Sequence, residues 1–396
     1  MRRVIRRLAW ILAGLGAVVW LLLWLELEGW INRVEPVALP PISAQANALH
    51  AASFVADLHA DSLLFGRDLR RRGRHGHVDL PRLREGGVAL QVFGVPTKVF
   101  FGTNIDRTEA HGLDALTVAG IARLSPIAWQ SPMERALYQA GRLAELARDS
   151  DGAFVLIRDR EDLADLKLAR AKGEMVIGGI LAIEGAHALE SDPANLQRAF
   201  DAGYRMIGLS HFFDNDYAGS SAGVDKGGLT PLGRATLAQM ESLGITADLA
   251  HLSPAAVDEV LDLSTRPVVV SHSGVRGTCD NARNLSDEQI RRVAAGGGVI
   301  GIGFWEVAVC GLTPTDIARA IQHVVQLVGA KHAALGSDYD GATTVGFDVS
   351  GLPEVTQAMV EVGLSEAEIQ LVLGENVVRV LSATLPARLP AAQDSR

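Results

Sequence analysis

Two side chains able to bind a metal ion or move a proton stand close together near residue 60. The stretch DLHADSLL (57–64) places His59 and Asp61 two positions apart in an apolar run. Residues i and i+2 of a β-strand face the same side, so both side chains would point to one place. Such a pair is either a buried His–Asp pair whose hydrogen bonds are satisfied within the protein or part of a metal or catalytic site. The rest of the chain decides between these interpretations.

Comparable residues close five further apolar runs. GGILAIEG carries Glu184, MIGLSH carries His211, TADLAH carries His251, VVVSH carries His272, and ALGSDYDG carries Asp338 and Asp340. Each alone could be a buried polar side chain whose hydrogen bonds are satisfied within the protein. Chance, however, does not readily place such a series at the same end of successive runs. Histidines with carboxylates suit Zn²⁺, or a relative such as Mn²⁺ or Co²⁺. The series therefore predicts a metal site.

The set is large enough for two ions. His59 and Asp61 can hold one ion, and His251 with His272 can hold a second. Two ions about 3.5–4 Å apart need an anionic bridge. No Lys that could be carbamylated ends any of these runs, so Glu184, between the two pairs, is the available bridge.

The chemistry of such a site also needs a proton acceptor. Water shared by two ions has a strongly lowered pKa and is a nucleophile at neutral pH. Asp338, in the last run, is placed to accept its proton and pass it on. Asp340 can compete for this role, because residues i and i+2 of a strand share a face.

The elements that must position these residues alternate regularly. Eight runs rich in Val, Ile, Leu and Ala are separated by helical patterns, at 53–61, 88–96, 176–185, 204–212, 245–253, 266–274, 298–305 and 332–339. Several are almost continuously hydrophobic, as strands covered on both faces of a parallel sheet are. The alternation predicts an α/β fold, a (β/α)8 TIM-type barrel, in which the strand ends converge on one mouth.

Helix signals support this alternation. Ser253 precedes PAAVDEVLDL, and Ser286 precedes DEQIRRVAA with Gln289 in the position of a capping box. A ninth run, 153–159, does not fit the count of eight and is expected as an extra strand in the long excursion between the second and third strands. The stretch 122–149 of that excursion is predicted to be helical.

Composition narrows the class of protein. The 396 residues are 48% hydrophobic and carry a net charge of −9, with no basic block after the N-terminus, which argues against a nucleic-acid partner. Only Cys279 and Cys310 are present, so a thiolate zinc site and a disulfide-dense scaffold are excluded.

The N-terminus differs from the rest. MRRVIRR carries four Arg, and Leu8 to Leu25 follow without a charge, long enough for a membrane span of about 17–25 residues. The Arg cluster predicts a cytoplasmic N-terminus and an exported body, periplasmic or extracellular. An uncleaved anchor is favoured, because the run exceeds the roughly 7–15 apolar residues of a signal peptide. The small residues of SAQANA (43–48) keep cleavage as an alternative.

These observations divide the chain into four parts. We expect an Arg-rich start with a transmembrane signal anchor at 1–30, a linker at 31–50, a catalytic barrel at 51–385 and a polar tail at 386–396. The oligomeric state stays open, a homodimer included.

The motifs DLHAD, AIEGAHAL, GLSHFFDND, DLAHLS, SHSGVRGTCDNARNLSDE and LGSDYDG, in this order over about 52–382, have a known counterpart. Together they resemble the membrane dipeptidase (renal dipeptidase) family of zinc peptidases, peptidase family M19 of the amidohydrolase superfamily. The resemblance implies hydrolysis of dipeptides, including those with a C-terminal D-residue, by attack of a metal-bridging hydroxide.

The resemblance also implies roles for individual residues. It implies two Zn²⁺, one held by His59, Asp61 and Glu184 and the other by Glu184, His251 and His272. Asp338 would shuttle the proton, His211 would bind substrate and stabilise the tetrahedral intermediate, and Arg283 would bind the substrate carboxylate.

The residues themselves agree with most of these roles. His211 is not needed to complete either ion's ligands, so it is free to stabilise an oxyanion. Arg283 follows His272 in the loop at the mouth, where a guanidinium suits bidentate capture of a carboxylate, and a surface salt bridge is the alternative.

Relatives bridge a pair of cysteines near Cys279 and Cys310, so a disulfide is expected in an exported body. The segment GFWEVAVC, at the end of the seventh predicted strand (298–305), lacks a Tyr that family members carry downstream of this strand.

Two other functions compete with the dipeptidase. One is another binuclear amidohydrolase, acting on an N-acyl amino acid, a cyclic amide or a lactone; H-x-D rather than H-x-H in the first strand, and the Glu bridge, count against it. The other is a membrane-tethered binding module without activity, which the loss of a ligand would support. None of the expected ligands is missing from the sequence.

Overall fold

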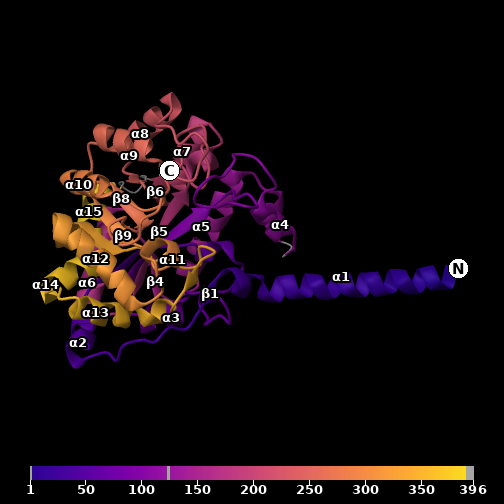
Figure 1. The fold of residues 1–396 in the computed structure, drawn as a ribbon, viewed down its shortest axis with the longest axis horizontal. Coiled ribbons are helices and arrows are strands. Elements are labelled where there is room, and N and C mark those ends of the chain that lie inside the picture. The colour runs from indigo at the N-terminus through magenta and orange to yellow at the C-terminus, as the bar shows by residue number, and fades with distance from the viewer. Residues whose placement is uncertain (1, 123–124, 389–396) are drawn as a thin grey trace, which may run out of the picture.

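A closed barrel of parallel strands forms the body of the protein in a computed structural model that describes residues 2–122 and 125–388 (Figure 1). The barrel strands are β2 (Val55–Ala60), β3 (Val88–Pro96), β5 (Ile177–Glu184), β6 (Tyr204–Gly208), β7 (Thr246–Asp248), β8 (Val269–Ser273), β9 (Val299–Ile302) and β10 (Ala333–Leu335). They pair in the order β3-β2-β10-β9-β8-β7-β6-β5, and β3 also pairs with β5, which closes the barrel. The predicted (β/α)8 fold is confirmed.

Helices separate the strands and surround the barrel (Figure 1). The main ones are α3 (Leu80–Glu85), α5 (Pro132–Arg148), α6 (Arg160–Ala171), α7 (Pro193–Asp201), α8 (Pro231–Leu243), α9 (Pro254–Leu263), α10 (Asp287–Ala295), α12 (Pro314–Val328), α13 (Leu352–Glu361), α14 (Glu366–Gln370) and α15 (Asn376–Thr384). Ser253 caps α9, and Ser286 forms the predicted capping box of α10 with Gln289. Buried apolar side chains from most of the strands pack with α6 and α15, and a larger cluster joins the strands to the other helices.

The excursion between the second and third barrel strands is partly as predicted. The ninth run contains β4 (Phe154–Leu156), which pairs in parallel with the first residues of β5. The helical stretch expected at 122–149 is instead divided between the end of α4 (Ala115–Ala122), the 3₁₀-helix η2 (Pro126–Trp129) and α5. Pro126 and Pro132 each begin a new helix, because proline fits the first turn but not a helix interior.

A single long helix, α1 (Arg2–Ile31), projects away from the body (Figure 1). Its part Arg2–Leu22 is long and apolar enough to cross a membrane, and no part of it is buried by the rest of the described chain. These properties suit an anchor or a signal sequence.

The segment 31–50, expected as a linker, lies against the body. β1 (Arg33–Val34) pairs with β11 (Thr344–Val345), which follows β10. α2 (Ala44–Ala52) packs on α13. From residue 389 onwards, the polar tail expected at 386–396 lies outside the described residues.

Candidate metal centre

The candidate residues lie at the C-terminal ends of the strands, but most strands end earlier than predicted. His59, Glu184 and His272 belong to β2, β5 and β8. His211, His251, Asp61 and Asp338 instead follow strand ends, in the connections that come next. The backbone of His251 and Asp338 has positive φ values, 65° and 60°, which few non-glycine residues adopt. Loops as well as strand faces therefore supply the site.

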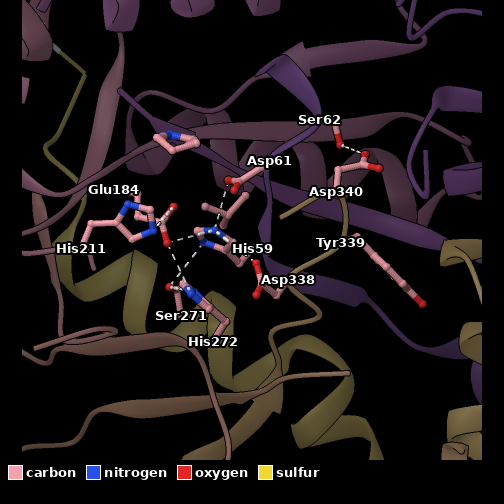
Figure 2. A network of polar contacts seen from close by, with 12 residues as sticks. His59, Asp61, Ser62, Glu184, His211, Ser271, His272, Asp338, Tyr339 and Asp340 are labelled. Carbon is pink, nitrogen blue, oxygen red and sulfur yellow. Dashed lines mark hydrogen bonds and ion pairs between the residues drawn. The ribbon is translucent and has the colours of Figure 1, made fainter. Parts of the chain in front are cut away.

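Seven buried side chains converge in this region and form what we call the histidine cluster: His59, Asp61, Glu184, His211, His251, His272 and Asp338. All of them except His251 are labelled in Figure 2. Glu184 lies at its centre. Its Oε1 is 3.0 Å from His251 Nε2, 3.4 Å from His272 Nε2 and 3.7 Å from His59 Nε2, and its Oε2 is 3.4 Å from His211 Nε2. On the far side, His59 Nε2 lies 3.2 Å from Asp61 Oδ1 and 4.0 Å from Asp338 Oδ1.

The donor atoms of the histidine cluster are spaced as metal ligands are. Nitrogen and oxygen ligands about 2.0–2.1 Å from a tetrahedral zinc ion lie roughly 3.3 Å from one another. Within the described residues, the buried His59 Nε2 and Asp61 Oδ1 have no hydrogen-bond partner. Three groups of donors could each hold an ion: His59, Glu184 and His272; Glu184, His211 and His251; and His59, Asp61 and Asp338. The residues present therefore fit a divalent cation.

Burial and neighbouring charges perturb the proton affinities in the cluster. Burial lowers the pKa values of His251 and His272 well below the ordinary value, so both rings are neutral. Burial, helped by Asp61, raises the pKa of Glu184 well above its ordinary value. Burial also lowers the pKa of His59, but the carboxylates of Glu184 and Asp61 outweigh it and raise this pKa to about 10. A metal ion at His59 would have to displace that proton.

Two aspartates that the sequence analysis did not single out hold the cluster from outside. Asp248 accepts hydrogen bonds from the backbone N (2.9 Å) and the hydroxyl (2.5 Å) of Ser271, whose Oγ lies 2.9 Å from His272 Nδ1. Asp57 accepts from the backbone N (2.8 Å) and the hydroxyl (2.7 Å) of Ser337, the residue before Asp338. Their spacing in the sequence was the available signal. Asp57 stands two positions before His59, and Asp248 stands three positions before His251.

Gly94 of β3 makes room for the cluster. A Cβ at this position would lie 2.6 Å from His59 Nε2 and would also meet Asp61 Oδ1. Real side chains do not come this close, so any residue larger than glycine would push His59 and Asp61 out of place. This role could not be predicted from the sequence, because it depends on which strand lies beside β2.

The structure separates Asp338 from Asp340, which we expected to share one face of a strand. That expectation is wrong: β10 ends at Leu335, and both aspartates lie in the loop that follows, with positive φ values of 60° and 62°. Asp338 points towards His59, whereas Asp340 points towards Ser62, whose hydroxyl donates to it at 2.5 Å (Figure 2). Of the two, only Asp338 is in the histidine cluster, and burial raises its pKa to about 8.

Arg283 is a buried cation beside the cluster. Its Nη2 donates to the backbone oxygen of His272 at 2.9 Å, and its guanidinium carbon lies 5.9 Å from the ring centroid of Trp305, in the segment where the family's Tyr is missing. The alternative of a surface salt bridge is wrong, because the side chain is buried and pairs with no carboxylate of the described chain. A buried, unpaired cation is costly unless it meets an anion.

A disulfide joins Cys279 and Cys310, as the resemblance implied. Cys279 lies in the loop that carries Arg283, and Cys310 ends α11 (Glu306–Val309), which directly follows Trp305. The bond therefore ties together the two segments on either side of the guanidinium.

The sequence and the fold of this chain are similar to those of known peptidases. The family model described as membrane dipeptidase, peptidase family M19, matches residues 43–393. An uncharacterized dipeptidase of Schizosaccharomyces pombe is 34% identical over 220 residues, which are 52% of this chain and only 53% of that relative. The dipeptidase verJ of Clonostachys rogersoniana is 29% identical over 323 residues, or 79% of this chain and 77% of the relative.

A solved structure shares the fold over nearly its whole length. The metallo peptidase of Rhodobacter sphaeroides, determined with a phosphinate mimic of the dipeptide L-Ala-D-Ala, superposes with a TM-score of 0.67 at 26% identity. The match covers 84% of this chain and 99% of that one.

Proposed function

Because this chain belongs to the membrane dipeptidase family, peptidase family M19, we propose that its histidine cluster binds two zinc ions and hydrolyses the peptide bond of dipeptides. The observation that carries the proposal is the convergence of four imidazoles on the two oxygens of one carboxylate, Glu184, at 3.0–3.7 Å. An ordinary buried ion pair does not gather so many donors on one acid, whereas a bridge between two cations does.

The ligands divide into two sets that share Glu184. His59 and Asp61 would hold one ion with it, and His251 and His272 the other. When bound, the ions would lower the pKa of a water molecule between them to make the attacking hydroxide, and would polarise the scissile carbonyl.

The chain's own groups would do the rest of the chemistry. Asp338, 4.0 Å from His59, would accept the proton of the attacking water and deliver it to the leaving amine. His211, whose pKa burial lowers well below the ordinary value, would be a neutral hydrogen-bond donor to the carbonyl oxygen as it becomes negative. Arg283, a buried guanidinium without a carboxylate partner in the described chain, would hold the C-terminal carboxylate of the substrate.

We also propose that the substrates include dipeptides with a C-terminal D-residue. Support comes from the Rhodobacter sphaeroides relative, whose structure contains a mimic of L-Ala-D-Ala. In this chain, recognition would rest on the carboxylate, through Arg283, and on the scissile carbonyl.

One experiment separates this function from its competitors. Purified full-length protein would be assayed for metal content and for turnover of L-Ala-L-Ala, L-Ala-D-Ala, an N-acetyl amino acid and a lactone. Two equivalents of zinc and turnover of the dipeptides alone support the proposal. Preference for the N-acyl compound or the lactone would point to another amidohydrolase, and an absence of turnover with metal bound would point to a binding module.

We propose that α1 anchors the protein, with its Arg-rich start in the cytoplasm and the barrel exported. The exposed apolar surface of Arg2–Leu22 and the Cys279–Cys310 disulfide, typical of an oxidising compartment, support this. Alkaline phosphatase fused after residue 50 should be active. An inactive fusion, together with an active cytoplasmic reporter fused at the same point, would show that the topology is the opposite of the proposed one.

A further inference from the structure

One segment of the body concentrates exposed apolar side chains. We call it the α4–η2 lobe: residues 97–122 and 125–131, between β3 and α5. Its Phe101, Leu113, Ile121 and Trp129 are 60%, 64%, 45% and 74% exposed. Beyond residue 43, only three other large apolar side chains of the described chain are similarly exposed: Leu168, Met175 and Leu263. Such a concentration marks an interaction surface.

A buried arginine braces the lobe from within, and the loop before α4 also exposes the polar residues Asn104, Asp106, Arg107, Glu109 and His111. Arg135 of α5 is buried and donates hydrogen bonds to the backbone oxygens of Thr97 and Ile127, both at 2.8 Å, and to Asp114 Oδ2 at 2.6 Å. One arginine thus fixes the start, the middle and the end of the lobe to the barrel. The outward apolar side chains therefore sit on a braced structure rather than on a loose loop.

The lobe lies beside the helix proposed to span the membrane. α4 contacts α1, and the lobe projects from the body on the side from which α1 departs (Figure 1). Trp30, near the inner end of α1, is also exposed. Tryptophan at both places matches the preference of this side chain for the membrane–water interface.

The inner end of α1 is fixed to the body, so the helix sets how the body is oriented. Glu28 is buried and pairs with Arg67, and Glu26 Oε1 lies 3.0 Å from Arg74 Nη1. Asn32 Oδ1 accepts a hydrogen bond from the backbone N of Ala342 at 2.9 Å. These contacts reach the loops after β2 and β10, at the C-terminal end of the barrel.

We propose that the α4–η2 lobe is a second membrane contact, in which Phe101, Leu113, Ile121 and Trp129 enter the interfacial layer of the bilayer that α1 spans. This inference rests on the proposed anchoring by α1. The lobe follows the C-terminal end of β3, so the contact turns the mouth of the barrel towards the membrane. Dipeptides then reach the histidine cluster from the layer of solvent next to the bilayer.

Nitroxide labels in the full-length protein, reconstituted in phospholipid nanodiscs, test this contact. The described chain has no free cysteine, so an introduced cysteine is the reactive thiol. We would label Trp129→Cys, with Val19→Cys in α1 as the lipid reference and Leu168→Cys, exposed on α6, as the aqueous control. Collision of each label with oxygen, which concentrates in lipid, is compared with collision with a water-soluble nickel complex.

The expected oxygen-to-nickel ratio at position 129 is several-fold higher than at 168 and closer to that at 19. A ratio equal to that at 168 overturns the contact while leaving the anchor intact. Low collision with both reagents also overturns it, in favour of a protein partner such as a second copy. An aqueous ratio at 19 instead refutes the anchor, and the ratio at 129 still decides the contact. Leu113→Cys repeats the measurement if the Trp129 variant fails to fold, with dipeptide turnover as the check of folding.

Discussion

Asp338 and Asp340 stand two residues apart, yet their carboxylates belong to two different kinds of buried charged cluster (Figure 2). Asp340 lies in what we call the Asp340 network, with Ser62, Arg67, His77 and Glu28. It accepts hydrogen bonds from the Ser62 hydroxyl at 2.5 Å, from the backbone N of His77 at 2.6 Å and from the guanidinium of Arg67, which also pairs with Glu28. Each carboxylate in this network has a cation or a donor of its own.

The histidine cluster is not balanced in this way. Its carboxylates face mainly imidazoles, and two of those rings, His251 and His272, are kept neutral by burial. The two clusters differ in how their donors are arranged: in the Asp340 network each carboxylate has a hydrogen-bond donor within the protein, whereas in the histidine cluster several potential metal ligands converge on one carboxylate.

Removing the charge of Glu184 should have the largest effect on the histidine cluster. In Glu184→Gln, two cations would face each other across a short gap without the bridging anion, so we expect loss of bound zinc and of turnover. Changes outside the ligand shell cost about 10–100-fold in metal affinity, so the loss here should be larger. Elemental analysis and dipeptide kinetics measure it, with Glu190→Gln, exposed in the same connection, as the control. Two retained equivalents of zinc with near-normal turnover would refute the bridge.

The next largest effect should come from Asp338. Asp338→Asn keeps the shape of the side chain but cannot accept a proton, so kcat should fall by about 10²–10⁴-fold. The metal content and the binding of a dipeptide should change little, because five other residues supply the proposed ligands. Steady-state kinetics with parallel metal analysis tests this. An unchanged kcat here, with a dead Asp340→Asn enzyme, would move the proton shuttle to the neighbouring carboxylate.

Asp340→Asn should instead lower stability, because Arg67 loses a buried partner. Breaking such a pair typically costs about 3–5 kcal/mol. Burial raises the pKa of Asp340, but Arg67 and His77 outweigh it and hold this pKa below its ordinary value. The stabilisation is thus present above about pH 3.9 and is lost as the pH falls through the lowered pKa. Urea denaturation at neutral and acidic pH should show the gap to wild type closing with acid; a gap that widens would contradict the network.

The comparison extends to two buried arginines. Arg67 has its carboxylates within the protein, whereas Arg283 has none in the described chain. In Arg283→Ala, loss of charged hydrogen bonds to the substrate should raise KM by roughly 10–100-fold with a smaller change in kcat. The penalty should shrink for a dipeptide whose C-terminus is amidated. An equal rise in KM for both substrates would mean that Arg283 does not bind the C-terminal carboxylate.

The sequence predicts the barrel and the members of the histidine cluster well, for a physical reason. The strands are buried on both faces and so read as continuous apolar runs, and polar residues at their ends stand out against that background. Glu184 and His272 are found in this way although they are far apart in the chain.

Backbone detail and neighbour relations could not be predicted in the same way. The rule that i and i+2 share a face fails for Asp338 and Asp340, because β10 is short and the loop has positive φ values. The role of Gly94 depends on the pairing of β2 with β3. Likewise, the segment 31–50 looks like a linker in the sequence, and only the contact of Asn32 with Ala342 and the pairing of β1 with β11 show that its start is fixed to the barrel.

The central claim is that the histidine cluster works as a two-ion site. Its most direct test is a zinc titration of the full-length protein after removal of metal with a chelator, with bound zinc and L-Ala-D-Ala turnover measured on the same samples. We expect no turnover without metal, and recovery that is complete only when the second equivalent has bound. Full turnover in metal-free protein, or at one equivalent of zinc, would contradict it.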